Sequence, residues 1–255
     1  MKKEITKQIS RVRKEATDIA SLNTVRQKRC WALVVNDIQK YVNLEIDWND
    51  FDDVRRVIPF DKYGKYKIEI DPSLVISKNH SYTSVLESLK KLTEVWVHTS
   101  DPLTKENTYF ALFPSYNEDQ GHYYLHLSFF TLRWFIFLKR GNYTSFHLNS
   151  FLSLSSTYSM DLYLFLSEYY NMDNRVVIIS LEDFKHRMNC PVSYDYKDIK
   201  TRVLEPSFNE FERTSSLLTF RSEAFSSKME LEKRSKGRKK IDMLKFTIIK
   251  RNDVK

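Results

Sequence analysis

The sequence is short of the residues that build phosphate-binding loops and metal sites. It contains four glycines and two cysteines among its 255 residues. Four isolated glycines cannot form the Gly-x-x-x-x-Gly-Lys loop that cradles nucleotide phosphates, which excludes this class of nucleotide hydrolysis. Cys30 and Cys190 provide neither a disulfide framework nor the spacing of a zinc site. We therefore expect no metal, no cofactor and a reduced, cytoplasmic setting.

Hydrophobic runs long enough to cross a membrane are also absent. The most apolar segment, Tyr123–Leu138, contains His126 and Arg133 and is shorter than the ~20 residues of a spanning helix. This segment predicts a buried strand that leads into a helix. The N-terminal residues MKKEITKQISRVRK are basic but have no apolar core, so we expect no signal peptide.

The side chains of an active site do not occur as a set. Rolling-circle nickases combine two histidines, spaced two residues apart, that bind a metal with a nucleophilic tyrosine. No two of the six histidines have this spacing. Without the metal ligands, Tyr169-Tyr170 is interpreted as the aromatic end of a helix and not as a nucleophile pair. His122 and His126 are expected on one strand, where four residues place side chains about 13 Å apart, too far for one ion. A solvated loop or a helix N-terminus is favoured over a cation site for the acidic group Asp47, Asp50, Asp52 and Asp53. The sequence therefore predicts that the protein is not an enzyme.

What the sequence does have is a basic excess in one region. The formal net charge is +8, yet residues 1–184 carry 23 Lys and Arg against 23 Asp and Glu, whereas residues 185–255 carry 18 against 10. A basic excess confined to one region is typical of a surface that binds a polyanion. Charge alone leaves open the alternative of a solvated basic tail.

Hydrophobic periodicity predicts helices and strands in the first half of the chain. The clearest element is an amphipathic helix at Tyr82–Leu92, for which Ser81 can serve as N-cap. The other segments are expected in this order: a helix at Ile9–Val42, a strand at Tyr66–Ile70, strands at Val95–Thr99 and Thr108–Phe113, a polar turn at Pro114–Gly121 and a strand at His122–Phe129.

The second half of the sequence also predicts helices followed by a two-strand hairpin. Helices are expected from Ser155 or Ser156 to about Tyr169, from Ser180 to Met188, and from Tyr194 or Asp195 to about Phe211 with a kink at Pro206. Strands are expected at Arg175–Ile179, Leu217–Ser222 and Met243–Ile249. An amphipathic helix followed by a two-strand hairpin is the order of elements in a winged helix, although other small α+β domains share it. We expect an α+β protein with two tandem winged-helix domains, residues 1–150 and residues 151–255.

The last helix of the second half has a cationic outer face. With Ile199, Val203 and Pro206 taken as its buried face, a step of 100° per residue exposes a polar set. That set consists of Lys197 and Thr201 opposite the core, with Lys200 and Arg202 on the two flanks. Such a helix fits the major groove of DNA, where Arg and Lys reach guanine edges and phosphates. An ordinary solvated helix face is the alternative.

The predicted hairpin that follows this helix has a basic tip. Six cations fall within eight residues: Lys233, Arg234, Lys236, Arg238, Lys239 and Lys240. Their mutual repulsion destabilises the tip unless a polyanion relieves it, and the sugar-phosphate backbone beside a groove can do so. Together, the helix and the tip favour binding to nucleic acid.

Three segments of the second half resemble the replication initiators (Rep proteins) of theta-replicating bacterial plasmids. Ser156-Thr-Tyr-Ser-Met-Asp-Leu-Tyr163 is similar to the stretch that opens their second winged helix. Tyr196-Lys-Asp-Ile-Lys-Thr-Arg-Val-Leu-Glu-Pro206 is similar to their recognition helix, and Lys236-Gly-Arg-Lys-Lys-Ile-Asp-Met-Leu-Lys-Phe246 to their wing and closing strand. The three segments occur in the family's order and cover about 100 residues; the first 150 residues match the family by architecture more than by motif.

The resemblance implies a function. Such initiators bind repeated double-stranded sites (iterons) at the origin, help to melt adjacent DNA and recruit host replication proteins in the bacterial cytoplasm, where they associate with the plasmid and nucleoid. Many also form homodimers through the first domain and repress their own gene. By analogy, the first domain, with its basic N-terminal arm, would dimerise, and the second would be the main DNA-reading module. The candidate contacts in the first domain are Thr83, Ser84, Glu87, Ser88, Lys90 and Lys91.

Two other functions remain open at the level of the sequence. A dimeric transcriptional repressor without initiation activity would use the same recognition chemistry. An enzyme or an accessory factor of a recombinase is a more distant alternative, which strand cleavage or nucleotide hydrolysis by the protein would reveal.

Overall fold

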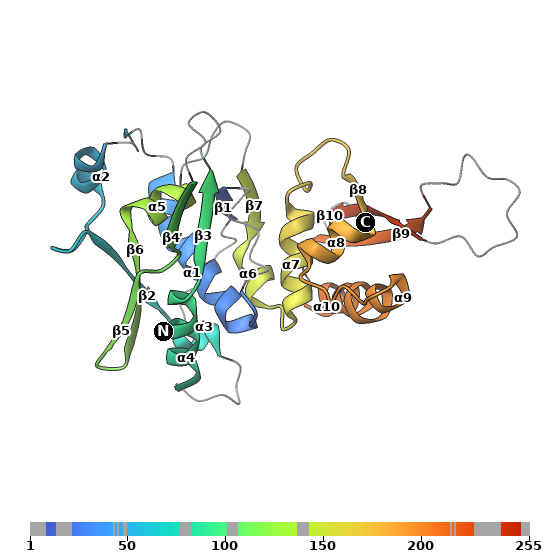
Figure 1. Cartoon of the computed structure of the whole chain (residues 1–255), viewed down its shortest axis with the longest axis horizontal. Coiled ribbons are helices and arrows are strands. Elements are labelled where there is room, and N and C mark those ends of the chain that lie inside the picture. The colour runs from blue at the N-terminus through green and yellow to red at the C-terminus, as the bar shows by residue number, and fades with distance from the viewer. Residues whose placement is uncertain are drawn as a thin grey trace, which may run out of the picture. The chain divides into compact units, whose positions relative to one another are not determined.

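The protein is described by a computed structural model that covers residues 9–13, 22–42, 44, 46–47, 50–76, 83–100, 107–136, 143–214, 216, 218–226 and 241–250. The chain divides into two compact units, Met1–Leu148 and Asn149–Lys255, which we call the N-terminal and C-terminal units (Figure 1). Within the residues described, no helix is long and apolar enough to cross a membrane.

The C-terminal unit has the order of elements of a winged helix. Its helices are α7 (Thr157–Ser167), α8 (Leu181–Arg187) and a continuous helical segment made of α9 (Tyr196–Ile199), η2 (Lys200–Leu204) and α10 (Glu205–Arg213). Its strands are β8 (Val176–Ser180), β9 (Leu218–Phe225) and β10 (Met243–Lys250). The three strands form an antiparallel sheet in the order β8-β10-β9, and the hairpin of β9 and β10 follows the last helix directly (Figure 1).

Side-chain caps begin two of these helices as the sequence predicts. The hydroxyl of Ser156 accepts a hydrogen bond from the Ser159 amide at the start of α7, and that of Ser180 accepts one from the Asp183 amide at the start of α8. Buried phenylalanines then join the helices to the sheet. Phe165 of α7, Phe184 of α8 and Phe246 of β10 lie with ring centroids 5.5–6.4 Å apart and exposed fractions of 2% or less. This aromatic cluster holds both helices against the sheet.

The N-terminal unit contains more elements. Its helices are α1 (Val25–Val42), α2 (Phe51–Val57), α3 (Pro72–Val75), α4 (Thr83–Thr93) and α5 (Phe129–Ile136), and α6 (Leu148–Leu152) follows at the unit boundary. Its strands are β1 (Ile9–Arg13), β2 (Lys65–Ile70), β3 (Trp96–Ser100), β4 (Asn107–Ala111), β5 (Ser115–Asp119), β6 (His122–Ser128) and β7 (Tyr143–His147). Asp50 and Asp71 cap α2 and α3 with their carboxylates, which accounts for part of the acidic group around residue 50.

The same sheet order recurs in the N-terminal unit. Strands β2, β6 and β5 form an antiparallel sheet with the last strand in the middle, as β8, β10 and β9 do. The hairpin of β3 and β4 is a separate two-stranded sheet inserted between α4 and β5. Both units are therefore winged helices of the α+β class, and the wing of the N-terminal unit is the hairpin of β5 and β6.

Two elements of the N-terminal unit differ from the sequence prediction. Ile9–Arg13 is not helical but forms strand β1, which pairs with β7. Pro114–Gly121 is not a turn throughout, because Ser115–Asp119 forms β5 and only Gln120 and Gly121, with φ of 51° and 82°, make the reversal. Two consecutive positive φ values are those of the tight hairpin turns that match strand twist. The predicted cap of α4, Ser81, lies outside the described residues.

Candidate nucleic-acid interface

The candidate recognition segment begins with a reciprocal cap. The amide of Asp198 donates to Asp195 Oδ1 over 3.0 Å, and the amide of Asp195 donates to Asp198 Oδ2 over 3.4 Å. This capping box satisfies two amides at the start of the segment and fixes where it begins, at one of the two residues that the sequence allowed.

The middle of the segment is a π-helical turn, and this changes the predicted buried face. Ile199 and Val203 are fully buried as expected, whereas Pro206 is exposed and Leu204 and Ser207 are buried instead. The amide of Glu205 bonds to the carbonyl of Lys200, five residues earlier. A turn with one extra residue advances every later side chain around the axis, so the regular step of 100° fails beyond Val203.

The four polar side chains predicted for the outer face are exposed. Lys197, Lys200, Thr201 and Arg202 all point away from the core, and the last three lie in the π turn. Two of the cations contact carboxylates of their own segment: Lys200 Nζ lies 3.6 Å from Glu205 Oε1, and Arg202 Nε lies 3.2 Å from Asp198 Oδ1. The Thr201 hydroxyl donates to the Lys197 carbonyl over 2.9 Å.

Arg202 is also held by an aromatic ring. Its guanidinium carbon lies 5.2 Å from the ring centroid of Tyr194. A hydrogen bond to the Tyr194 side chain raises the pKa of Arg202 above its usual value, and the negative charge of Asp198 raises this pKa as well. Tyr194 in turn shares a hydrogen bond with Tyr158 of α7, which also bonds to Cys190. Burial raises the pKa of Tyr158 to about 12 and that of Cys190 to about 11, so both groups are protonated at neutral pH.

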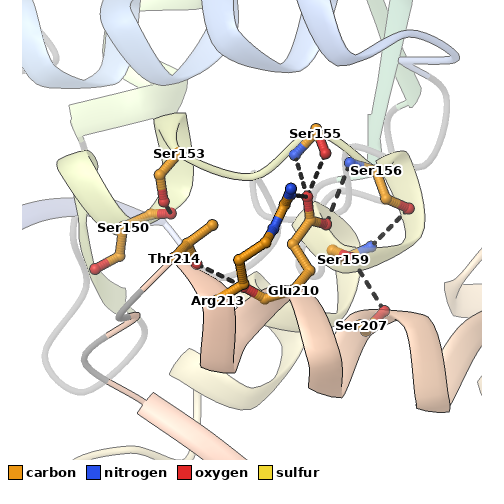
Figure 2. A network of polar contacts seen from close by, with 9 residues as sticks. All are labelled: Ser150, Ser153, Ser155, Ser156, Ser159, Ser207, Glu210, Arg213 and Thr214. Carbon is orange, nitrogen blue, oxygen red and sulfur yellow. Dashed lines mark hydrogen bonds and ion pairs between the residues drawn. The ribbon is translucent and has the colours of Figure 1, made fainter.

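A polar network fixes the other end of the segment (Figure 2). The carboxylate of Glu210, 7% exposed, accepts hydrogen bonds from the Ser155 amide over 2.7 Å, from the Ser155 hydroxyl and from the Ser156 amide over 3.3 Å. The Ser159 hydroxyl donates to Ser207 Oγ over 3.2 Å. Figure 2 shows that these contacts join the first turn of α7 to α10. The sequence predicts Ser155 or Ser156 as the cap of this helix, and Ser156 is the cap, whereas a buried glutamate such as Glu210 has no local signal.

The candidate surface of the N-terminal unit is only partly exposed. Thr83, Lys90 and Lys91 of α4 are exposed and Ser84 is half-buried. Ser88, predicted to lie on this surface, is 5% exposed and donates its hydroxyl to the Ser84 carbonyl over 2.8 Å. The bond to its own helix satisfies the Ser88 hydroxyl, and its burial keeps this side chain from contacting a ligand.

The wings of the two units differ in charge. The tip of the N-terminal wing, from Ser115 to His122, contains Glu118 and Asp119 and no Lys or Arg. The predicted wing cations of the C-terminal unit, Lys233, Arg234, Lys236, Arg238, Lys239 and Lys240, lie outside the described residues. The structure describes the two strands that flank them, β9 and β10.

The two histidines considered as metal ligands contact different side chains. Both lie on β6, where His122 Nδ1 is 2.6 Å from Glu69 Oε1 and His126 Nδ1 is 2.8 Å from the Ser115 hydroxyl. Burial, together with the charge of Lys65, lowers the pKa of His126. Among the described residues no three His, Cys, Asp or Glu side chains are grouped as a metal site would require.

Two winged helices, one of which presents a cationic helix on its surface, define a class of DNA-binding proteins. Comparison with known proteins identifies the family within that class. The family model described as initiator replication protein, WH1, matches residues 15–167, and that described as initiator Rep protein, WH2, matches residues 180–248. The chain therefore belongs to the family of initiator Rep proteins.

Among solved structures, the chain is similar to the Pi initiator protein in complex with iteron DNA. The match has a TM-score of 0.63 and 20% sequence identity, and it covers 94% of this chain and 96% of that one. At this level of identity the likeness shows a shared fold. No curated protein matches the sequence.

Proposed function

We propose that the protein initiates plasmid replication by binding repeated double-stranded sites at the origin, without enzymatic activity of its own. Membership of the initiator Rep family over both winged helices carries this proposal. The Pi initiator, which shares the fold, was solved with iteron DNA. The exposed cationic face of the C-terminal segment supplies the chemistry for the same kind of ligand.

The proposed contacts divide by chemistry. Lys197, Lys200, Thr201 and Arg202 would lie in the major groove, and the cations at 233–240 would neutralise phosphates beside it. In the N-terminal unit, Thr83, Ser84, Lys90 and Lys91 would position the protein on the backbone. The acidic tip of that unit's wing opposes phosphate contact, which suits a role in homodimerisation or in recruiting host replication proteins.

Footprinting of the purified protein on DNA upstream of its gene tests the proposal most directly. An initiator protects several tandem repeats, whereas a repressor without initiation activity protects a single inverted repeat. In parallel, a plasmid that carries only the gene and its flanking DNA should replicate in a permissive bacterial host. The matched control carries a frameshift early in the gene; replication of both plasmids, or of neither, contradicts the proposal.

A further inference from the structure

The turn between α8 and α9 is built rigidly although it lies at the surface. Helix α8 ends with Asn189 at a φ of 50°, and the Cys190 amide donates to the Lys185 carbonyl over 2.8 Å. A left-handed residue followed by a hydrogen bond from the next amide to the carbonyl five residues earlier is a Schellman-type helix end. The amide of Tyr194 then closes a turn onto the carbonyl of Pro191 over 3.0 Å.

A buried lysine fixes the middle of this turn. Lys185 is 9% exposed, and its ammonium group donates to the Val192 carbonyl over 3.2 Å while it pairs with Glu182 at 2.9 Å. The hydrogen bond to its carbonyl fixes the backbone at Val192, and the side chain of this residue faces solvent. Val192 is 83% exposed, more than any other exposed large apolar side chain among the described residues.

Single exposed apolar residues are common on protein surfaces, so exposure alone assigns nothing. The position of Val192 is what distinguishes it. It lies three residues before Asp195, the cap of the segment that carries the candidate DNA contacts, and two residues before Tyr194, the ring under Arg202. In helix-turn-helix proteins the N-terminal part of the recognition helix contacts the base edges, so the turn before it borders the same groove.

The major groove offers one apolar group to such a side chain. Thymine presents a C5-methyl group there, while the other base edges present hydrogen-bond donors and acceptors. We infer that Val192 contacts the 5-methyl group of a thymine and that the protein reads this base by apolar contact, beside the polar readout by Lys200 and Arg202. This inference rests on the proposed function, because it needs the C-terminal unit to lie in the major groove.

The test replaces thymines of the footprinted site, one at a time, with deoxyuridine, which lacks only the methyl group. Wild-type protein should bind about fourfold more weakly at one position, the factor expected for one buried methyl group. Val192→Ala should lose about the same factor on the unmodified site and nothing further on the substituted one. Ile178→Ala on β8, 55% exposed, is the matched control and should behave as the wild type does.

Two results would overturn the inference while leaving the proposed function intact. In one, the wild type binds thymine and deoxyuridine equally at every position. In the other, Val192→Ala keeps the full difference between the two bases, which means that another side chain contacts the methyl group. A titration with a scrambled duplex distinguishes these two results from failure of the proposed function. Equal affinity for the scrambled and footprinted duplexes would contradict both the proposed function and the contact by Val192.

Discussion

Arg202 has contacts within its own segment that the proposed contact with a base would replace. Its guanidinium group stacks on Tyr194 and lies 3.2 Å from the carboxylate of Asp198. An exposed ion pair of this kind is weak because solvent screens it, and it is weaker than a bidentate contact with guanine. The contacts therefore hold the side chain in place without preventing the proposed transfer to a base.

The first prediction follows from that balance. Arg202→Ala or Lys200→Ala should weaken binding to the footprinted site by about 1–3 kcal/mol and should relax specificity at one base pair. Titration of wild type and variants against every single-base variant of the site measures both effects. An equal loss on all sequences would mean that the side chain contacts phosphate rather than a base.

Glu210 stabilises the fold rather than the DNA complex. Glu210→Ala should leave the Ser155 and Ser156 amides without their acceptor at the start of α7, and should lower the free energy of unfolding by about 3 kcal/mol. Urea denaturation measures the loss. Asn209→Ala, an exposed change on the same helix, should cost less than about 0.5 kcal/mol. Similar losses for the two variants would contradict the structural role of Glu210.

The buried thiol of Cys30 gives a prediction about pH. Burial raises its pKa from 9.0 to about 12, so the unfolded chain loses this proton first as the pH rises. The stabilisation is complete below pH 9 and is lost between pH 9 and 12, with a slope of about 1.4 kcal/mol per pH unit. Cys30→Ala should have a shallower fall in unfolding free energy between pH 9 and 10.5. An identical pH dependence for wild type and variant would show that the thiol is not the source.

At the scale of the element, the π turn and Pro206 belong together. Proline has no amide hydrogen and its ring clashes with the carbonyl four residues earlier, which a wider turn relieves. The turn also buries Leu204 next to Val203 while three of the candidate contacts stay exposed. The five residues Lys200–Leu204 thus contain both buried core side chains and three of the proposed DNA contacts.

Comparing the free energy of one hydrogen bond with that of burying a core side chain shows whether Pro206 causes the π turn. Pro206→Ala restores one hydrogen bond, worth about 0.5–1.5 kcal/mol, but a regular helix would move Leu204, which the wider turn buries, out of the core at roughly 1.5–3 kcal/mol. The π turn should therefore persist. The variant should unfold within about 1 kcal/mol of the wild type and bind the footprinted site within about twofold. A tenfold change in affinity would show that the proline itself sets the helix geometry.

The sequence predicted elements whose signal is local and missed those set by distant partners. The capped helices α7 and α8 and the alternating strand β6 were found because their caps and periods lie within a few residues. Hydrophobic periodicity predicts a helix where strand β1 lies, because the strand's partner, β7, is about 130 residues away and leaves no local signal. The polar sequence of strand β5, Ser-Tyr-Asn-Glu-Asp, predicts a turn because it shows no apolar alternation. In the structure none of these side chains is fully buried.

The candidate site shows the same division. The outer face of Lys197, Lys200, Thr201 and Arg202 follows from helical period over one or two turns, and these side chains are exposed. Pro206 was placed on the wrong face, because a π turn depends on tertiary packing that no short motif encodes. The role of Glu210 has no local signal for a related reason: it is a buried charged group whose partners, Ser155 and Ser156, lie 55 and 54 residues away in the sequence.

At the scale of the whole molecule, the arrangement of charge differs between units whose net charge is equal. Residues 1–148 carry 22 Lys and Arg against 18 Asp and Glu, and residues 149–255 carry 19 against 15, so each unit has a formal charge of +4. In the C-terminal unit seven of the 19 Lys and Arg fall in residues 228–240, whereas Tyr196–Arg213 carries four Lys and Arg against four Asp and Glu. A local concentration of charge, rather than the net value, decides where a polyanion binds.

The last prediction tests that concentration. Replacing Lys236, Arg238 and Lys239 with Gln should reduce the slope of log affinity against log salt concentration by about 0.9 for each phosphate that is no longer neutralised, and therefore by about two to three units if all three side chains engage DNA. Affinity should fall by similar factors on specific and scrambled duplexes, since phosphate contacts carry no sequence information. Lys90→Gln with Lys91→Gln is the matched change in the N-terminal unit and reports whether α4 also contacts the backbone. An unchanged slope in the wing variant, with Arg202→Ala still defective, would assign DNA binding to the recognition segment without the wing.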